Sequence, residues 1–104
     1  MTRPYVVSKG AAADLREITR YTLAQWGETQ CRTYIAELER AATTVATGDG
    51  IFKDMSFILP GLRMVWSGKH CIFCMPQPGQ PAIILGVFHE KMDIIARLKN
   101  RLRT

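Results

Sequence analysis

The sequence predicts an α+β domain with the element order β-α-α-β-β-β-α, in which a helical hairpin packs on a mainly antiparallel sheet. Apolar side chains recur at intervals of three and four residues on both sides of Gly27, which predicts two consecutive helices. Residues 62–88 contain three strand-like stretches separated by turns. A basic stretch with helical spacing follows, so the predicted fold ends in a basic C-terminal helix.

The first expected elements are a short strand at residues 4–8 and a helix that begins at Ser8. The Ser8 hydroxyl can accept a hydrogen bond from a backbone N–H of the first helical turn. Helical spacing relates the side chains expected on the buried face, which are Leu15, Ile18, Thr22 and Trp26. Gly27 ends this helix, and Trp26 is expected to pack at the corner of the hairpin.

The second helix has a regular three-and-four repeat and stops at the Gly-Asp-Gly sequence of residues 48–50. Its apolar positions are Cys31, Tyr34, Ile35, Leu38, Ala41, Ala42 and Val45. The short break between the two helices makes them an antiparallel hairpin. Residues 48–60 are too apolar for a solvated loop, so we expect them to cover an edge of the core or to contact a partner.

The second half of the chain reads as a series of strands. Residues 62–67 alternate in polarity, residues 67–69 form a turn, and residues 70–75 form the next strand. Residues 76–81 contain three prolines and predict a stiff loop. Residues 82–88 carry no charge, which suits a strand buried on both faces. The final helix, from residue 92, would present Met92, Ile95, Leu98 and Leu102 on one side.

The length of 104 residues is sufficient for one modest core, so we expect residues 1–104 to form a single domain. No apolar run reaches the roughly 18 residues that span a bilayer. The N-terminal residues lack the apolar region of a signal peptide. We therefore expect a soluble, cytoplasmic protein that does not bind membranes.

The net charge of +5 is unevenly distributed. Residues 1–50 contain six basic and six acidic side chains, whereas residues 89–104 contain five basic and two acidic ones. This excess in the second half favours an acidic partner, which would be either a nucleic acid or an acidic protein segment.

The CxxC sequence of Cys71 and Cys74 is not expected to form a disulfide or a metal site. In a strand, residues three apart point to opposite faces and lie roughly 10 Å apart, beyond the disulfide range of about 7 Å. No second pair of Cys or His residues completes a zinc site, and no phosphate-binding or serine-hydrolase motif occurs. No metal and no cofactor are expected.

Several stretches, taken in order, resemble the plasmid-type ParE branch of the RelE/ParE toxin superfamily over nearly the whole chain. They are Ala13–Ile18 with Tyr21 and Trp26-Gly27, Phe52–Ser56, Pro60–Arg63, and Phe88–Glu90 with Met92-Asp93. The resemblance implies a toxin of a type II toxin–antitoxin module that poisons DNA gyrase and blocks replication. Such a toxin is an inhibitor rather than an enzyme.

The resemblance also implies the partners. DNA gyrase would be contacted on its DNA-cleaving subunit, with or without the bound DNA. A ParD-type antitoxin would neutralise the toxin through a disordered segment that becomes ordered on binding. Operator DNA would be bound only indirectly, through the antitoxin.

Two sets of contact residues are expected. The target would be met by the corner after the last strand and by the basic helix, through His89, Glu90, Lys91, Asp93, Arg97, Lys99, Arg101 and Arg103. The antitoxin would be met by a mostly apolar surface with basic pockets, whose candidates are Leu15, Ile51, Phe52, Met55, Arg63 and Trp66. For His89 the structural alternative is a backbone hydrogen bond that orients the helix.

The RelE branch of the superfamily offers a different function, that of a ribosome-dependent mRNA endoribonuclease. Arg63 could then hold the phosphate, and His89 could act as base or acid. The tyrosine or His-Tyr ending of that branch is missing, since this chain ends in Arg101-Leu102-Arg103-Thr104. A third alternative is direct nucleic-acid binding, for which the chain lacks an aromatic set that stacks on single-stranded bases.

Overall fold

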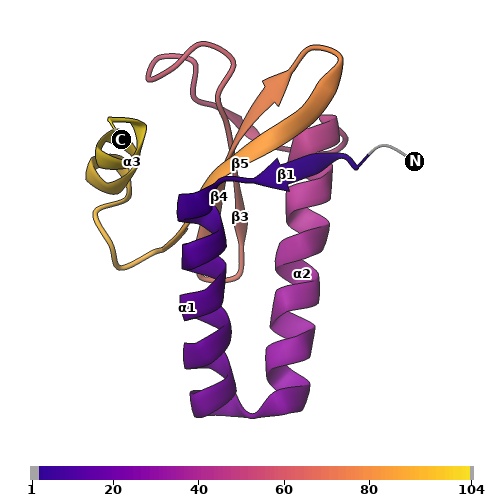
Figure 1. Ribbon diagram of the computed structural model, residues 1–104, viewed down its shortest axis with the longest axis vertical. Coiled ribbons are helices and arrows are strands. Elements are labelled where there is room, and N and C mark those ends of the chain that lie inside the picture. Colours follow the sequence, from indigo (N-terminus) through magenta and orange to yellow (C-terminus); the bar gives the residue numbers. More distant parts are fainter. Residues whose placement is uncertain (1–2, 104) are drawn as a thin grey trace.

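A computed structural model describes residues 3–103 and confirms the predicted α+β fold. Its elements are β1 (Tyr5–Val7), α1 (Lys9–Trp26), α2 (Glu28–Thr47), β2 (Lys53–Asp54), β3 (Arg63–Ser67), β4 (His70–Gln77), β5 (Gln80–His89) and α3 (Ile94–Leu102). The sequence did not predict β2, which has two residues. Figure 1 shows α1 and α2 side by side as a long hairpin.

The sheet has the strand order β1-β5-β4-β3-β2. β1 is parallel to β5, and the other neighbours are antiparallel. Opposite Phe73 and Cys74 of β4, the register on β5 passes from Gly86 to Ile84, so Leu85 is an extra, bulged residue. β1 ends at Val7, which is level with Ile84. The part of β5 beyond the bulge therefore has no strand on its outer side.

The two faces of the sheet carry separate cores. The helical hairpin covers one face, where Leu38 and Val45 pack with Ile72 and Ile84. The opposite face is covered by the segment 55–62 and by α3, whose Leu98 is buried with Phe73 and Phe88. The middle of β5 is therefore covered on both faces, as the uncharged sequence of residues 82–88 predicted.

The ends of the helices follow the predicted signals. The Ser8 hydroxyl accepts a hydrogen bond from the backbone N–H of Ala11 at 3.1 Å. Gly27 and Gly48 end the first two helices with φ of 87° and 81°, a region of backbone conformation that glycine adopts without strain. Helix α3 begins at Ile94 rather than at residue 92, because the Asp93 carboxylate accepts from the Ala96 N–H at 3.2 Å.

Trp26 does not pack at the corner of the hairpin, contrary to the prediction, and 62% of its surface is exposed. Figure 1 gives the reason, since the hairpin extends far beyond the strands and its tip has no sheet to cover. The predicted stiff loop at residues 76–81 was also too long. β4 continues to Gln77 and β5 begins at Gln80, so the connection is only Pro78 and Gly79.

Cys71 and Cys74 are buried free thiols on opposite faces of β4, as predicted. Burial raises the pKa of each thiol to about 11, which keeps both protonated and unreactive at neutral pH. Within residues 3–103, no three His, Cys, Asp or Glu side chains are grouped as a metal site requires. In the same part of the chain, no helix is long and apolar enough to cross a membrane.

A candidate interaction surface around helix α3

Helix α3 is attached to the sheet by one face. Ile94, Leu98 and Arg101 are related by helical spacing; Leu98 is fully buried, and the other two are partly buried. The predicted inner face was different: Met92, Ile95 and Leu102 are 36–39% exposed. Only Leu98 of the four predicted residues is in the core. The outer surface of α3 is therefore both apolar and basic.

Arg101 points inward and binds Asp14 of α1. Its guanidinium donates to both carboxylate oxygens at 2.8 and 2.9 Å, and also to the carbonyl of Leu85 at 3.0 Å. Asp14 in turn accepts from the backbone N–H of Val87 at 3.0 Å. The ion pair thus satisfies the two backbone groups that the bulge turns outward on β5. The hydrogen bond to Asp14 also raises the pKa of Arg101.

Arg101 is consequently not available as a target contact, which corrects the sequence-based prediction. Its side chain is 23% exposed and lies over the ring of Phe88, 5.0 Å from the centroid. In the sequence analysis, Asp14 belonged only to the stretch Ala13–Ile18 that carries the family resemblance, and no role was predicted for it. The signal that could have found it is its position one helical turn after Gly10, whose missing side chain leaves room for Arg101.

The corner between β5 and α3 is held by its own hydrogen bonds. The His89 Nδ1 accepts from the backbone N–H of Lys91 at 3.1 Å, and the backbone N–H of Glu90 donates to the carbonyl of Lys69 at 2.8 Å. His89 thus makes a hydrogen bond to the backbone, as expected if its role is to orient the helix and not to contact a target. The side chains of Glu90, Lys91 and Asp93 are exposed, although the Asp93 carboxylate caps α3.

Three cations at this end of the chain face solvent: Arg97 and Lys99 of α3 and Arg103, the C-terminal cap of that helix, are exposed. None of the three takes part in a salt bridge with any residue between 3 and 103. An exposed cation without a carboxylate partner keeps its full charge for an external anion. Together with Lys91 they form the cationic part of the surface, which is opposite the helical hairpin.

His70, His89 and Tyr34 form a polar cluster where β4 and β5 meet α2. The Tyr34 hydroxyl lies 2.5 Å from the Nδ1 of His70, and the two imidazole rings are edge-to-face at 5.1 Å. Burial, reinforced by His89, lowers the pKa of His70 to about 4, against the opposing charges of Asp14 and Glu90. His70 is therefore neutral at pH 7, and its Nδ1 shares a hydrogen bond with the Tyr34 hydroxyl. The sequence did not predict the contact between Tyr34 and His70.

The structure does not bring Arg63 and His89 together. Arg63 pairs across the strands with Cys74, at one end of the sheet, whereas His89 pairs with His70 at the other end. From strand rise and spacing, their Cα atoms are roughly 16 Å apart. Arg63 donates to the carbonyl of Val45 at 3.0 Å and lies over the Phe52 ring at 4.5 Å. It thus stabilises the end of α2.

The candidate antitoxin residues do not form one patch. Leu15 and Phe52 pack on the hairpin side of the sheet, and Met55 is buried on the other side. Ile51 is 96% exposed and Trp66 is 47% exposed. Met55, at 3% exposure, is not accessible in this conformation, which is contrary to the prediction. Ile51 and Trp66 remain the accessible apolar members of the set.

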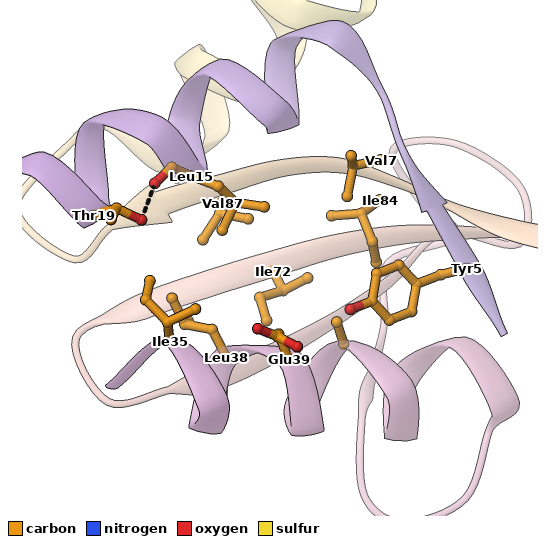
Figure 2. A pocket seen from close by; sticks show the side chains of 11 residues that line it. Tyr5, Val7, Leu15, Thr19, Ile35, Leu38, Glu39, Ile72, Ile84 and Val87 are labelled. Carbon is orange, nitrogen blue, oxygen red and sulfur yellow. Dashed lines mark hydrogen bonds between the residues drawn. The ribbon is translucent and has the colours of Figure 1, made fainter. Parts of the chain in front are cut away.

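Leu15 lines an apolar cavity of about 220 Å³ between the hairpin and the sheet. Figure 2 shows Ile72, Ile84 and Val87 of the sheet facing Leu15, Ile35 and Leu38 of the helices across it. The Thr19 hydroxyl is occupied, because it donates to the carbonyl of Leu15 at 2.8 Å. Only Tyr5 and Glu39 bring further polar groups to the lining. This arrangement has no nucleophile or acid–base pair and offers an apolar recess only.

Comparison with known proteins gives consistent results. Residues 5–94 match the family described as "ParE toxin of type II toxin-antitoxin system, parDE". The chain is 46% identical over 99 residues to "Toxin ParE" of Escherichia coli, a match that covers 95% of this chain and 96% of that protein. It is 31% identical over 96 residues to "Toxin ParE1" of Caulobacter vibrioides, covering 92% and 98% of the two chains.

A solved structure has the same fold. The "Chromosomal ParDE TA system from P. aeruginosa" aligns with a TM-score of 0.63 at 16% sequence identity. The alignment covers 80% of this chain and 90% of the other chain. At this identity the match shows a shared fold and nothing more specific.

Proposed function

Because the chain belongs to the ParE toxin family of type II toxin–antitoxin systems, we propose that it poisons DNA gyrase and is neutralised by a ParD-type antitoxin. The family membership rests on residues 5–94 and on relatives that match nearly full length. The identity of the target is the proposal.

The observation that carries the proposal is how the two candidate residue sets are arranged. The pair required for RNA cleavage, Arg63 and His89, lies at opposite ends of the sheet, and both side chains make contacts with the backbone. General acid–base chemistry requires its groups within hydrogen-bond reach of one substrate. The exposed cations Arg97, Lys99 and Arg103, in contrast, lie on α3 or at its C-terminal cap and have no carboxylate partner among residues 3–103. This arrangement supports binding and not catalysis.

In the proposed mechanism, Arg97, Lys99 and Arg103 contact an acidic surface on the DNA-cleaving part of gyrase or the DNA held in it. A poison must bind the cleaved complex more tightly than the resealed one, since only differential affinity shifts an equilibrium. Cations that contact DNA phosphates near the strand break would supply this difference in affinity. Lys91 extends the same surface from the corner after β5.

The proposed antitoxin contacts use the accessible apolar residues, with Ile51 and Trp66 foremost. Apolar side chains of an ordered antitoxin segment would cover them, and the recess beside Leu15 would accept one further side chain. The toxin itself would not contact operator DNA, because the antitoxin supplies that binding.

The test is a gyrase cleavage assay with purified chain, gyrase, ATP and supercoiled plasmid, quenched with detergent and protease. We expect linear DNA with the wild type and its loss when the cognate antitoxin is added. A triple variant, Arg97→Ala/Lys99→Ala/Arg103→Ala, should reduce linear DNA at least tenfold, because three charge-assisted contacts are removed. Point substitutions are preferable to deletion of residues 97–104, which would also remove Leu98 and Arg101.

The matched control is Lys9→Ala/Arg16→Ala/Arg40→Ala, which removes the same charge from exposed positions of α1 and α2. It should poison gyrase like the wild type. Equal loss in both triple variants would attribute the effect to net charge and reject α3 as the contact surface. Absence of linear DNA with folded wild type would reject gyrase as the target.

A further inference from the structure

A groove of about 650 Å³ lies between the segment 53–58 and helix α3, on the side of the sheet opposite the hairpin. One wall includes Lys53 and Phe57, and the other is formed by α3 and its C-terminal cap. Lys53 pairs across the strands with Met64, so its side chain emerges on the face of the sheet that α3 covers. The fold thus brings together two exposed segments from distant parts of the chain.

An exposed aromatic ring lines this groove. Phe57 is 76% exposed, more than any other aromatic side chain between residues 3 and 103. On the facing wall, Ile95 and Leu102 are both exposed, and they lie on one side of α3 because they are seven residues apart. The sequence indicated no aromatic set for stacking on bases, whereas the structure provides one exposed ring opposite an aliphatic wall. A planar group with two apolar faces would contact both walls.

The rim of the groove is cationic. Lys53, Lys99 and Arg103 line it, no acidic residue does, and no salt bridge among residues 3–103 involves any of the three. Asp54 follows Lys53, but its carboxylate is occupied by the backbone N–H and the hydroxyl of Ser56. The groove therefore favours an anionic ligand.

We propose that this groove binds a segment of single-stranded DNA. A nucleotide combines a planar base, whose faces are apolar, with an anionic phosphate, and the groove offers a partner for each. One base would stack on the Phe57 ring, and the flanking phosphates would meet Lys53, Lys99 and Arg103. Lys99 and Arg103 are four residues apart, which is about 6 Å along α3, so both can contact the same strand.

Duplex DNA matches the groove less well. The bases of a duplex are stacked on one another and cannot reach the Phe57 ring, so only the cations would be used. The exposed aromatic face likewise favours a ligand that stacks over an anionic chain without aromatic groups. An unpaired strand is the form of DNA that uses both properties of the groove.

The role of this binding rests on the proposed function and deepens it. A strand left unpaired beside the cut made by gyrase would be the segment that the groove holds. The resealed duplex offers no unpaired base, so the groove would bind the cleaved state more tightly, as a poison requires. Phe57 and Lys53 would thereby join the cations proposed to contact the target.

The experiment measures the fluorescence anisotropy of a labelled oligothymidylate of about 12 nucleotides, titrated with the full chain. We expect binding that weakens with salt, with a slope of about −2 in log affinity against log salt for three phosphate contacts. Two matched ligands carry the same number of phosphates per strand. These are the duplex of the same sequence and a strand of abasic sites, and each should bind at least tenfold more weakly.

Two single variants separate stacking from charge. Phe57→Leu should weaken binding about tenfold and leave the salt slope unchanged, because it removes the aromatic face only, and Phe57→Tyr should restore the affinity. Lys53→Ala should reduce the slope by about 0.7, as the loss of one phosphate contact predicts. Both positions are exposed, so the fold should persist, which circular dichroism checks. The control Arg40→Ala on α2 should bind like wild type.

Equal affinity for the abasic strand or for the duplex would overturn the stacked, unpaired base. Binding that neither Phe57→Leu nor Lys53→Ala weakens would overturn the site. Binding of an acidic peptide that depends on these residues, without binding of the oligonucleotide, would assign the groove to a protein ligand instead.

The binding assay contains no gyrase, so its outcome is separate from that of the proposed function. Oligonucleotide binding without linear DNA in the cleavage assay would reject gyrase as the target and leave the groove as a DNA site. Linear DNA that neither Phe57→Leu nor Lys53→Ala reduces would leave gyrase as the target and reject the part of the groove in poisoning.

Discussion

Asp14 and Arg101 close the open edge of β5, although 87 residues separate them in sequence. The carboxylate accepts from the Val87 N–H while the guanidinium donates to the Leu85 carbonyl, so the pair provides the hydrogen bonds that a further strand would have provided. The same contacts attach α3 to α1 and the sheet. The position of the cationic surface therefore depends on this ion pair together with the packing of Leu98.

Replacement of Asp14 by alanine should destabilise the protein by about 2–4 kcal/mol, because the partly buried Arg101 guanidinium loses its carboxylate and the buried Val87 N–H loses its acceptor. Urea unfolding would measure the loss. The control is Glu17→Ala, which removes the exposed ion pair with Arg20 and should cost less than about 1 kcal/mol. Similar costs for the two variants would show that Asp14 is an ordinary surface carboxylate.

Gly10→Ala should destabilise the protein, although alanine is the better helix former by about 1 kcal/mol. A Cβ at residue 10 would lie 2.7 Å from the Arg101 side chain, which its hydrogen bonds prevent from moving aside. The sign should reverse in an Arg101→Ala background, where Gly10→Ala should stabilise. Thermal unfolding of the wild type, the two single variants and the double variant completes a double-mutant cycle. If Gly10→Ala changes the stability with the same sign in both backgrounds, the contact between residue 10 and Arg101 is contradicted.

Stability should fall as the pH drops from about 6.5 to about 4, in part through His70. Burial lowers the pKa of His70 to about 4, so the unfolded chain binds the additional proton first and acid favours unfolding. Above pH 6.5 the ring is neutral in both states and the contribution is fully retained. His70→Gln should remove about 1–2 kcal/mol of the acid-induced loss, a range reduced for the partial exposure of the ring. Urea unfolding at pH 7 and 4.5 compares the two proteins, and an unchanged pH dependence would contradict this role.

Arg63→Ala and His89→Ala should both retain gyrase poisoning, and neither they nor the wild type should cleave mRNA in a translation extract. Arg63→Ala should cost about 1–2 kcal/mol of stability, because the hydrogen bond to the Val45 carbonyl and the contact with the Phe52 ring are lost. Cleavage by the wild type that both substitutions abolish would instead support the nuclease function.

Local signals predicted much of the fold. The hydroxyl of Ser8, the glycines at 27 and 48 and the strand periodicity around Cys71 and Cys74 depend on neighbours within a few residues, and the structure agrees with each prediction. The position of Trp26 was not predictable in the same way. Its exposure depends on the length of the helices relative to the sheet, which is a property of the assembled fold.

The site was less predictable, because its geometry depends on contacts between distant elements. The apolar residues of α3 form one broad stripe at helical spacing, with Ile94 and Leu98 toward one side of it and Ile95 and Leu102 toward the other. Spacing alone cannot tell which of them packs inward. The inward turn of Arg101 required knowledge of the bulge at Leu85 and of a carboxylate on α1. Charge distribution nevertheless indicated the region in which the exposed cations Arg97, Lys99 and Arg103 lie.

The pairing of β1 with β5 determines when the fold can form during synthesis. Tyr5 pairs with Ala82, so the first strand has to wait until most of the chain has been made, and a topology with such distant contacts folds slowly. The ion pair of Asp14 forms later still, because it requires Arg101. The basic surface on α3 is therefore held in place only after residue 101 has been made. A partner already present in the cell could bind the chain as soon as that surface exists, before a free, folded copy accumulates.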